Sequence, residues 1–240
     1  MTIALVDADI LAYQVTSASE EAIDWGDDIW TLHGDMKFAR QMVASELKRL
    51  NTIVQATSMI LCISGARDDN WRLGVWPTYK NHRKSKRKPL IYRPLIEHLK
   101  AEYNCLWWPH LEADDVMGFM SHDDTIIISD DKDLKTIPGR LYRPTADEHL
   151  TITSEEADQW HLTQTLTGDA VDGYPGCPGV GPVKAKKLLD PAPTWETVVK
   201  AYASQGLTEE EALVQARVSR ILRPTEFDPV TQEITLWNPA

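Results

Sequence analysis

The chain has 240 residues, of which 42% are hydrophobic and 25% are charged, and these values are typical of a globular protein with a sizeable core. They exclude a largely disordered chain, and no apolar run is long enough to suggest a membrane span. The three cysteines are odd in number and lack metal-ligand spacing, which argues against a disulfide framework or a zinc site. We therefore expect reduced thiols in a cytoplasmic protein.

The pattern of apolar residues alternates between strands and helices over the first 130 residues. Strands are predicted at 2–7, 58–63, 105–108 and 125–129, and helices from about residue 10 and at 36–54, 91–103 and 112–120. This alternation predicts an α/β fold with a mainly parallel twisted sheet flanked by helices. After about residue 150 the pattern becomes helical. We expect a core over 1–150 and a helical region over 151–240.

Residues 64–90 have no clear periodicity and contain a run of basic side chains. Six cations fall within nine residues: Lys80, Arg83, Lys84, Lys86, Arg87 and Lys88. Because the net charge is −11, a nucleic-acid site would depend on such a local concentration of positive charge. Lys80 and Arg83 could hold phosphate and Tyr79 could stack on an unpaired base. A solvated loop, with Tyr79 packed in the core, is the alternative.

Acidic residues gather at the predicted ends of strands and in one later loop. They are Asp7 and Asp9, then Glu112, Asp114 and Asp115, then Asp131 and Asp133, and lastly Asp169 and Asp172. Any single group could simply cap a helix. Together, acids after parallel strands would crowd at one sheet edge, where Mg²⁺ or Mn²⁺ would relieve their repulsion. Two such ions suit phosphodiester hydrolysis.

A glycine-rich stretch at 176–182 precedes three lysines, Lys184, Lys186 and Lys187. Backbone amides beside Gly179 and Gly181 could approach a phosphate closely, whatever the base sequence. A plain turn is the alternative.

These motifs, in this order, resemble the 5′ nuclease, or flap endonuclease, superfamily over nearly the whole chain. They are Val6-Asp7, Tyr79-Lys80 with Arg83, Glu112-Ala113-Asp114-Asp115, Asp131-Lys132-Asp133-Leu134, and Gly168-Asp169 through Asp172 to Gly181. Closer similarity to the 5′–3′ exonucleases of T-seven-like podophages is carried by segments 127–138, 160–162, 168–174 and 220–223.

The resemblance implies a role for each matched residue. Asp7, Glu112 and Asp114 would hold one Mg²⁺ or Mn²⁺ ion. Asp115, Asp131, Asp133, Asp169 and Asp172 would surround a second. Tyr79, Lys80, Arg83 and Lys84 would belong to a helical arch at 71–95. Gly179, Gly181, Lys184, Lys186 and Lys187 would form a helix-hairpin-helix at 168–190 that grips duplex DNA, with K⁺ as a further cofactor. The family usually has an acid directly after the second strand, where this chain reads Ile63-Ser64-Gly65, so Asp68 or Asp69 is expected to substitute.

The resemblance thus implies a phage 5′–3′ exonuclease of the host cytoplasm, which we expect to be a monomer with no membrane association. Its expected substrates are duplex DNA with a 5′ end, flaps and RNA paired to DNA, and replication proteins are expected partners. A non-catalytic DNA-binding module and a PIN-like ribonuclease are the alternatives. Only the nucleases need the acidic residues, and the glycine-rich stretch favours an enzyme that grips duplex DNA.

Overall fold

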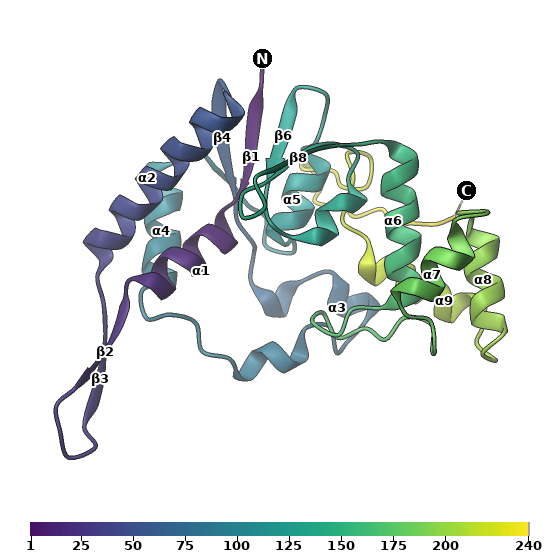
Figure 1. Ribbon diagram of the computed structural model, residues 1–240, viewed down its shortest axis with the longest axis horizontal. Coiled ribbons are helices and arrows are strands. Elements are labelled where there is room, and N and C mark those ends of the chain that lie inside the picture. The colour runs from purple at the N-terminus through teal and green to yellow at the C-terminus, as the bar shows by residue number, and fades with distance from the viewer. Residues whose placement is uncertain (240) are drawn as a thin grey trace.

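A six-stranded sheet forms the centre of the structure, a computed structural model that describes residues 1–239 (Figure 1). The strand order is β5-β4-β1-β6-β7-β8, and only the β7–β8 pair is antiparallel. The strands are β1 (Ile3–Asp7), β4 (Ser58–Cys62), β5 (Cys105–Leu106), β6 (Thr125–Ile128), β7 (Gly139–Arg143) and β8 (Glu148–Ile152). The predicted fold class is confirmed: a mainly parallel sheet flanked by helices.

Helices cover both faces of the sheet because alternate residues of a strand point to opposite sides. Ala4 and Val6 of β1 pack into a core shared with α1 (Ala8–Ala18), α2 (Met36–Val54) and α4 (Tyr92–Glu102). Leu5, between them, packs into a second core with α5 (Ala113–Phe119). The central strands are buried on both sides, which explains their continuous apolar runs.

Four helices follow the sheet. They are α6 (Ser154–Thr167), α7 (Pro182–Leu189), α8 (Trp195–Ala203) and α9 (Glu209–Ser219). Parts of α6, α7 and α8 share a third core. Beyond α9 the chain returns to the sheet, where Ile221, Leu222 and Phe227 join the core around α5. The C-terminal residues therefore pack on the sheet as well as on the helical region, and β8 runs through the expected boundary at residue 150.

The segment between β4 and α4, where a helical arch was expected over 71–95, is helical only in short stretches. It contains α3 (Arg72–Val75) and two short 3₁₀ turns, η1 (Arg67–Asp69) and η2 (Asn81–Ser85). Pro77 and Pro89 disfavour a continuous helix here, because proline lacks a backbone donor. In Figure 1 this segment passes below the sheet.

A two-stranded hairpin between α1 and α2 was not predicted. It consists of β2 (Glu20–Asp24) and β3 (Trp30–Gly34) and projects from the body at the lower left of Figure 1. Within the described residues, no helix is both long and apolar enough to cross a membrane.

Candidate active site

The candidate site begins at the carboxyl end of β1, next to the centre of the sheet. Asp7 ends this strand and caps α1 by accepting a hydrogen bond from the Ile10 amide at 3.0 Å. The Ser129 hydroxyl, which follows β6, donates to its other oxygen at 2.9 Å. Asp7 is only 5% exposed. It is therefore held rigidly where two parallel strands end, as expected for a site in an open α/β sheet.

Glu112, at the N-terminus of α5, brings the basic segment to this edge. The Lys80 ammonium donates to one of its oxygens at 2.7 Å, and the Tyr79 hydroxyl donates to the other at 2.8 Å. Burial opposes ionisation of Glu112, but the nearby charges of Lys80 and Arg72 hold its pKa at about 2. Glu112 is thus a stable anion in contact with a cation from the segment below the sheet.

The second expected metal shell is divided between two segments. Asp131 precedes the 3₁₀ turn η3 (Lys132–Thr136) and accepts from the Asp133 amide at 2.9 Å. Asp169 lies beyond α6 and accepts from the Lys132 ammonium at 2.8 Å and from the Val171 amide at 2.7 Å.

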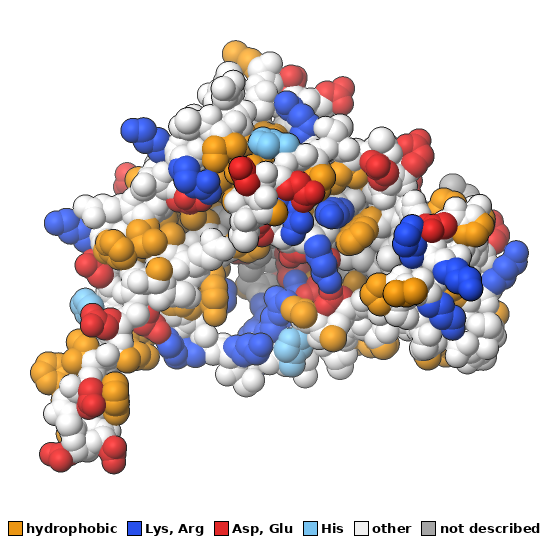
Figure 2. All heavy atoms as spheres, in the orientation of Figure 1, with side chains coloured by type: hydrophobic (Ala, Val, Ile, Leu, Met, Phe, Trp, Pro, Cys, Tyr) orange, Lys and Arg blue, Asp and Glu red, His pale blue; other side chains and the backbone are white. Residues whose placement is uncertain are grey.

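Asp172 connects this loop to the basic segment. Its carboxylate accepts from the Tyr79 hydroxyl at 3.1 Å and from Arg83 at 3.2 Å, and it lies 3.6 Å from the Lys80 ammonium. The Lys80 amide also donates to the Asp172 carbonyl at 2.8 Å. The structure therefore brings together Lys80, Arg83 and acids far apart in the chain. Figure 2 shows blue and red side chains close together around the central hollow of the molecule.

Several carboxyl groups are close enough to oppose one another's ionisation. Burial, together with Asp9, raises the pKa of Asp7 to about 7. Burial and the charges of Asp131 and Asp172 raise the pKa of Asp133 to about 7. Asp114 has its pKa raised well above the ordinary value by burial and by Asp131 and Asp7. The site therefore carries more negative charge than its own cations balance.

This donor set suits hard divalent cations, which prefer carboxylate oxygens and would neutralise the crowded charge. Within residues 1–239, no three His, Cys, Asp or Glu side chains are arranged so that they already surround one metal position. Lys80 and Lys132 instead hold Glu112 and Asp169. The residue types fit divalent ions, and some of these side chains would have to turn toward a bound ion.

Asp115 differs from the other predicted ligands because its side chain is turned away into the core. It is 0% exposed and makes a bidentate pair with Arg72, with both distances 2.7 Å. The Trp71 indole and the Glu112 and Leu222 amides also donate to it. These donors occupy both carboxylate oxygens. The geometry favours a structural role in place of the predicted metal contact.

Tyr79 was expected to stack on an unpaired base, and its placement argues against that role. The ring is 5% exposed and packs in a small core with Tyr174 and Val218, while its hydroxyl contacts Glu112 and Asp172. Core packing, the alternative considered for this residue, is what the structure shows. Lys84 lies in η2 and is exposed.

The structure shows which acid contacts the chain just after β4, where the family usually has a carboxylate. Asp68 and Asp69 lie in the exposed turn η1, where Asp68 is 4.0 Å from Arg67. Asp9 instead reaches the end of β4, because its carboxylate accepts from the Ser64 amide at 3.1 Å. No sequence pattern indicates this approach directly, since 55 positions separate Asp9 and Ser64.

The glycine-rich stretch leads into α7 on the helical side of the molecule. The expected helix-hairpin-helix range of 168–190, which the structure describes throughout, contains one α-helix, α7. Gly179 has a φ of +70°, which favours glycine, and a Cβ added at Gly179 or Gly181 would meet nothing within 4 Å. The backbone here is therefore open to a ligand. Lys184 and Lys186 contact Gly179 and Asp190, and Lys187 is exposed on the same helix.

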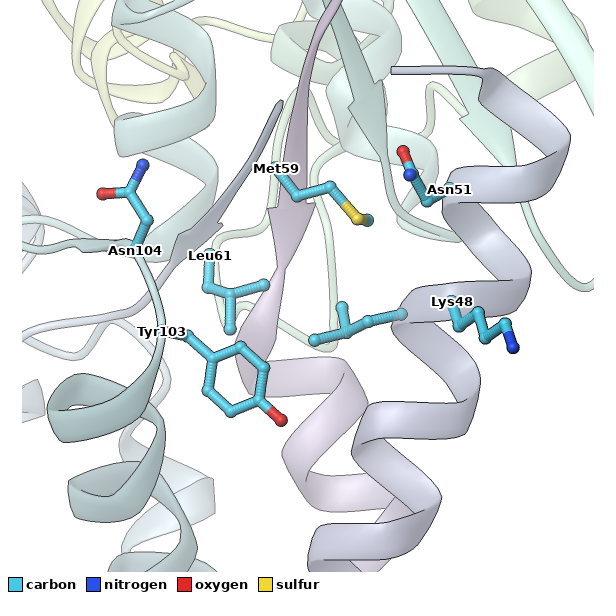
Figure 3. A pocket seen from close by; sticks show the side chains of 7 residues that line it. Lys48, Asn51, Met59, Leu61, Tyr103 and Asn104 are labelled. Atoms are coloured by element: carbon cyan, nitrogen blue, oxygen red, sulfur yellow. The ribbon is translucent and has the colours of Figure 1, made fainter. Parts of the chain in front are cut away.

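Two shallow hollows lie away from the acidic site. One, of about 230 Å³, is lined by Leu47, Lys48, Asn51, Met59, Leu61, Tyr103 and Asn104 between α2, β4 and the end of α4 (Figure 3). The other, of about 250 Å³, lies between α7 and α8. Neither is lined by any of the predicted acidic ligands, so neither is the candidate active site.

The same fold occurs in solved phage structures. The T5 D15 protein co-crystallised with metal ions aligns with a TM-score of 0.71 and 15% identity, covering 94% of this chain and 90% of that one. A pseudo-enzyme-product complex of the T5 D15 flap endonuclease with DNA and metal ions aligns with a TM-score of 0.68 and 15% identity, covering 94% and 90%. The chain therefore shares the fold of these T5 proteins.

Sequence relatives define the family more closely, although no family model matches the chain. The exodeoxyribonuclease of Enterobacteria phage T3 is 34% identical, covering 99% of this chain and 93% of the relative. The exonuclease of Escherichia phage T7 is 33% identical over the same shares. The chain belongs to the phage exonuclease family of the 5′ nuclease superfamily, and it is a 5′–3′ exonuclease.

Proposed function

We propose that this exonuclease hydrolyses phosphodiester bonds from the 5′ ends of duplex DNA and uses two divalent cations, Mg²⁺ or Mn²⁺. The observation that carries the proposal is the meeting of carboxylates from four separate segments with Lys80 at one sheet edge. A catalytic role explains this crowding, because it is unfavourable for folding without bound cations. The T3 and T7 relatives are exonucleases by name, which supports the same reaction for this chain.

We assign the ligands in two groups. Asp7, Glu112 and Asp114 would hold the first cation, with Asp9 in place of the acid missing after β4. Asp131, Asp133, Asp169 and Asp172 would hold the second. Bound divalent ions supply an activated water and stabilise charge on the phosphate and the leaving oxygen.

Lys80 and Arg83 are proposed to bind and orient the phosphate beside these acids. The Lys80 ammonium is only 11% exposed and Arg83 is 38% exposed, so Lys80 lies deeper in the site. Both cations contact Asp172, and a phosphate that enters could accept from the same donors. In a site with little water, such contacts stabilise the negative charge that develops during hydrolysis.

The open backbone at Gly179 and Gly181, with Lys184, Lys186 and Lys187, is proposed to bind the duplex behind the reacting end. Contacts to phosphates through amides and lysines do not depend on base sequence. Lys84, exposed in η2, would add a contact on the freed strand. K⁺ is a further candidate ligand of this glycine-rich stretch.

Flaps and RNA paired to DNA are proposed as additional substrates. The flap endonuclease Xni of Shewanella baltica is 24% identical over 76% of each chain, and its name supports flap cleavage. A duplex grip that contacts phosphates would also accept a hybrid if it binds the DNA strand. This range suits a monomeric enzyme of phage replication that removes primers in the host cytoplasm.

Digestion of end-labelled DNA tests the proposal. With Mg²⁺, a 5′-labelled linear duplex should release short 5′-phosphorylated products, and a 3′-labelled strand should shorten progressively, while closed circular duplex resists. Asp131→Asn should abolish cleavage. The neighbouring Asp130→Asn is a matched control, because Asp130 instead accepts from the Thr145 amide and hydroxyl. Products with 3′ phosphate, or equal attack on circles and linear ends, would refute the mechanism.

A further inference from the structure

The β2–β3 hairpin exposes large apolar side chains although it projects from the body. Trp25 is 66% exposed, Ile29 and Trp30 are both 59% exposed, and Leu32 is 43% exposed. All are near the tip or on β3, and in Figure 2 orange and red side chains cover this projection. Isolated exposed apolar residues are common, but a group of this kind on one projecting element marks an interaction surface.

The hairpin and its ends carry only one sign of charge. Residues 20–35, all of them described, include six acids and no Lys or Arg: Glu20, Glu21, Asp24, Asp27, Asp28 and Asp35. Such a surface repels DNA phosphates, and so it does not extend the duplex grip. It is complementary to a basic surface.

The pairing of the strands defines an apolar strip between the acids. Trp30 lies opposite Asp24, and Leu32 lies opposite Ala22, so these side chains share one face of the hairpin. On the other side, the Trp25 indole donates to the Thr31 hydroxyl at 2.8 Å, which fixes its orientation. The Trp25 ring is therefore held in a set orientation and can act as an anchor with little loss of entropy.

The base of the hairpin is attached to the segment that carries the basic run. Glu20 accepts from Arg87 at 2.9 Å and from the Leu90 amide at 2.7 Å. Gly34 lies against Ile91, where an added Cβ would be 2.8 Å from the isoleucine side chain. These contacts attach the base of the hairpin to the body, and its tip projects away from the body (Figure 1).

We propose that the β2–β3 hairpin is a docking element for a second protein that acts on the same DNA. Its partner would present a basic groove whose apolar walls receive Trp25 and Trp30 on the two faces of the hairpin. Proteins that bind DNA carry basic surfaces because they must contact phosphates, so this class matches the acids of the hairpin. A second copy of the chain is disfavoured, because two molecules of net charge −11 that meet through their acidic hairpins would repel.

Binding to a defined set of proteins tests the proposal. The DNA polymerase, the helicase and the single-strand-binding protein encoded by the same genome are each purified and titrated against the full chain by calorimetry. We expect at least one to bind, more weakly as salt is raised. The double variant Trp25→Ala with Trp30→Ala should weaken binding on the order of 30-fold, since buried tryptophans dominate interfaces. The triple variant Asp24→Lys, Asp27→Lys and Asp28→Lys should weaken it similarly.

Matched controls separate the hairpin from general surface effects. Val230→Ala removes an apolar side chain that is 87% exposed elsewhere, and the triple variant Glu97→Lys, Glu102→Lys and Glu210→Lys changes the net charge equally. Both should leave binding unchanged, and every variant should cleave linear duplex at the parent rate. Failure of all three proteins to bind, or binding unaffected by the hairpin variants, would overturn the proposal. So would hairpin variants that lose affinity for DNA itself, because the hairpin would then be a DNA contact.

Discussion

Replacing Asp115 with Asn tests whether this acid has a structural role or binds a metal ion. Asp115 is completely buried and accepts two hydrogen bonds of 2.7 Å from Arg72, which is itself only 3% exposed. Asparagine nearly preserves the shape but removes the charge, so the Arg72 guanidinium stays buried without its main counterion. Its remaining partners are Glu112 at 3.2 Å and the carbonyls of Val218 and Arg220.

Breaking a buried ion pair by changing one partner costs roughly 3–5 kcal/mol. The contact with Glu112 and the two carbonyls should keep the loss near the lower end of that range. Because each kcal/mol changes the melting temperature of a chain of this size by roughly 2–4 °C, we expect a decrease of roughly 6–12 °C. Lys186→Ala is the control, since the Lys186–Asp190 pair is exposed and should contribute less than about 1 kcal/mol.

Urea unfolding followed by circular dichroism measures the loss, and cleavage of end-labelled duplex measures activity on the folded protein. Folded Asp115→Asn protein should keep substantial Mg²⁺-dependent cleavage. The double variant Arg72→Met with Asp115→Leu should recover much of the stability, because it removes both charges. Unchanged stability combined with abolished cleavage would refute this reasoning and restore Asp115 to the metal shell.

Three further predictions concern the site and the DNA grip. In the absence of metal, Asp7 and Asp133 have folded pKa values of about 7 against an ordinary value of 3.8, so the folded state binds protons more tightly than the unfolded state. Their contribution to the free energy of unfolding is fully present below about pH 4 and is lost as the pH rises to about 7. Melting temperatures measured in EDTA should therefore fall between these two pH values, and added Mg²⁺ should raise the melting temperature at pH values above about 7. A melting temperature that does not change with pH would contradict the charge crowding. Lys80→Ala should lower the single-turnover rate by about 10²–10³-fold with little change in duplex affinity. If the duplex affinity falls by the same factor as the rate, Lys80 only binds substrate. The triple variant Lys184→Ala, Lys186→Ala and Lys187→Ala should weaken duplex binding. The slope of log affinity against log salt concentration should fall by roughly one unit for each phosphate that is no longer bound. Fluorescence anisotropy at several salt concentrations measures this slope, and an unchanged slope would contradict the proposed duplex contact.

The sheet and its flanking helices could be predicted because their patterns depend on local burial. The range of α2 agrees at both ends with the prediction of 36–54, and β1 lies one residue inside the predicted strand. The continuous apolar run at Thr125–Ile128 marks a central strand. The β2–β3 hairpin escaped prediction because neither of its faces is buried, so no alternation of apolar and polar residues could indicate it.

The meeting of the acids could be expected from their positions after parallel strands, but their individual contacts could not. Arg72 carries no motif, and its partner Asp115 is 43 positions away. An acid whose oxygens are occupied by buried donors looks the same in the sequence as one that faces solvent. The same limit explains why Asp68 or Asp69 was expected to replace the acid missing after β4, since only the fold shows that Asp9 contacts the chain there.

The contacts of Arg72 with the end of α9 have a consequence for the folding of the enzyme. Arg72 donates to the carbonyls of Val218 and Arg220, and the Leu222 amide donates to Asp115 beside the candidate site. Because chains are made from the N-terminus, these partners are synthesised after every proposed ligand. A nascent chain that ends before residue 218 can form the Arg72–Asp115 pair but leaves three hydrogen bonds of that pair unmade. The buried pair between α3 and α5 is therefore complete only after residues 218–222 have folded against it.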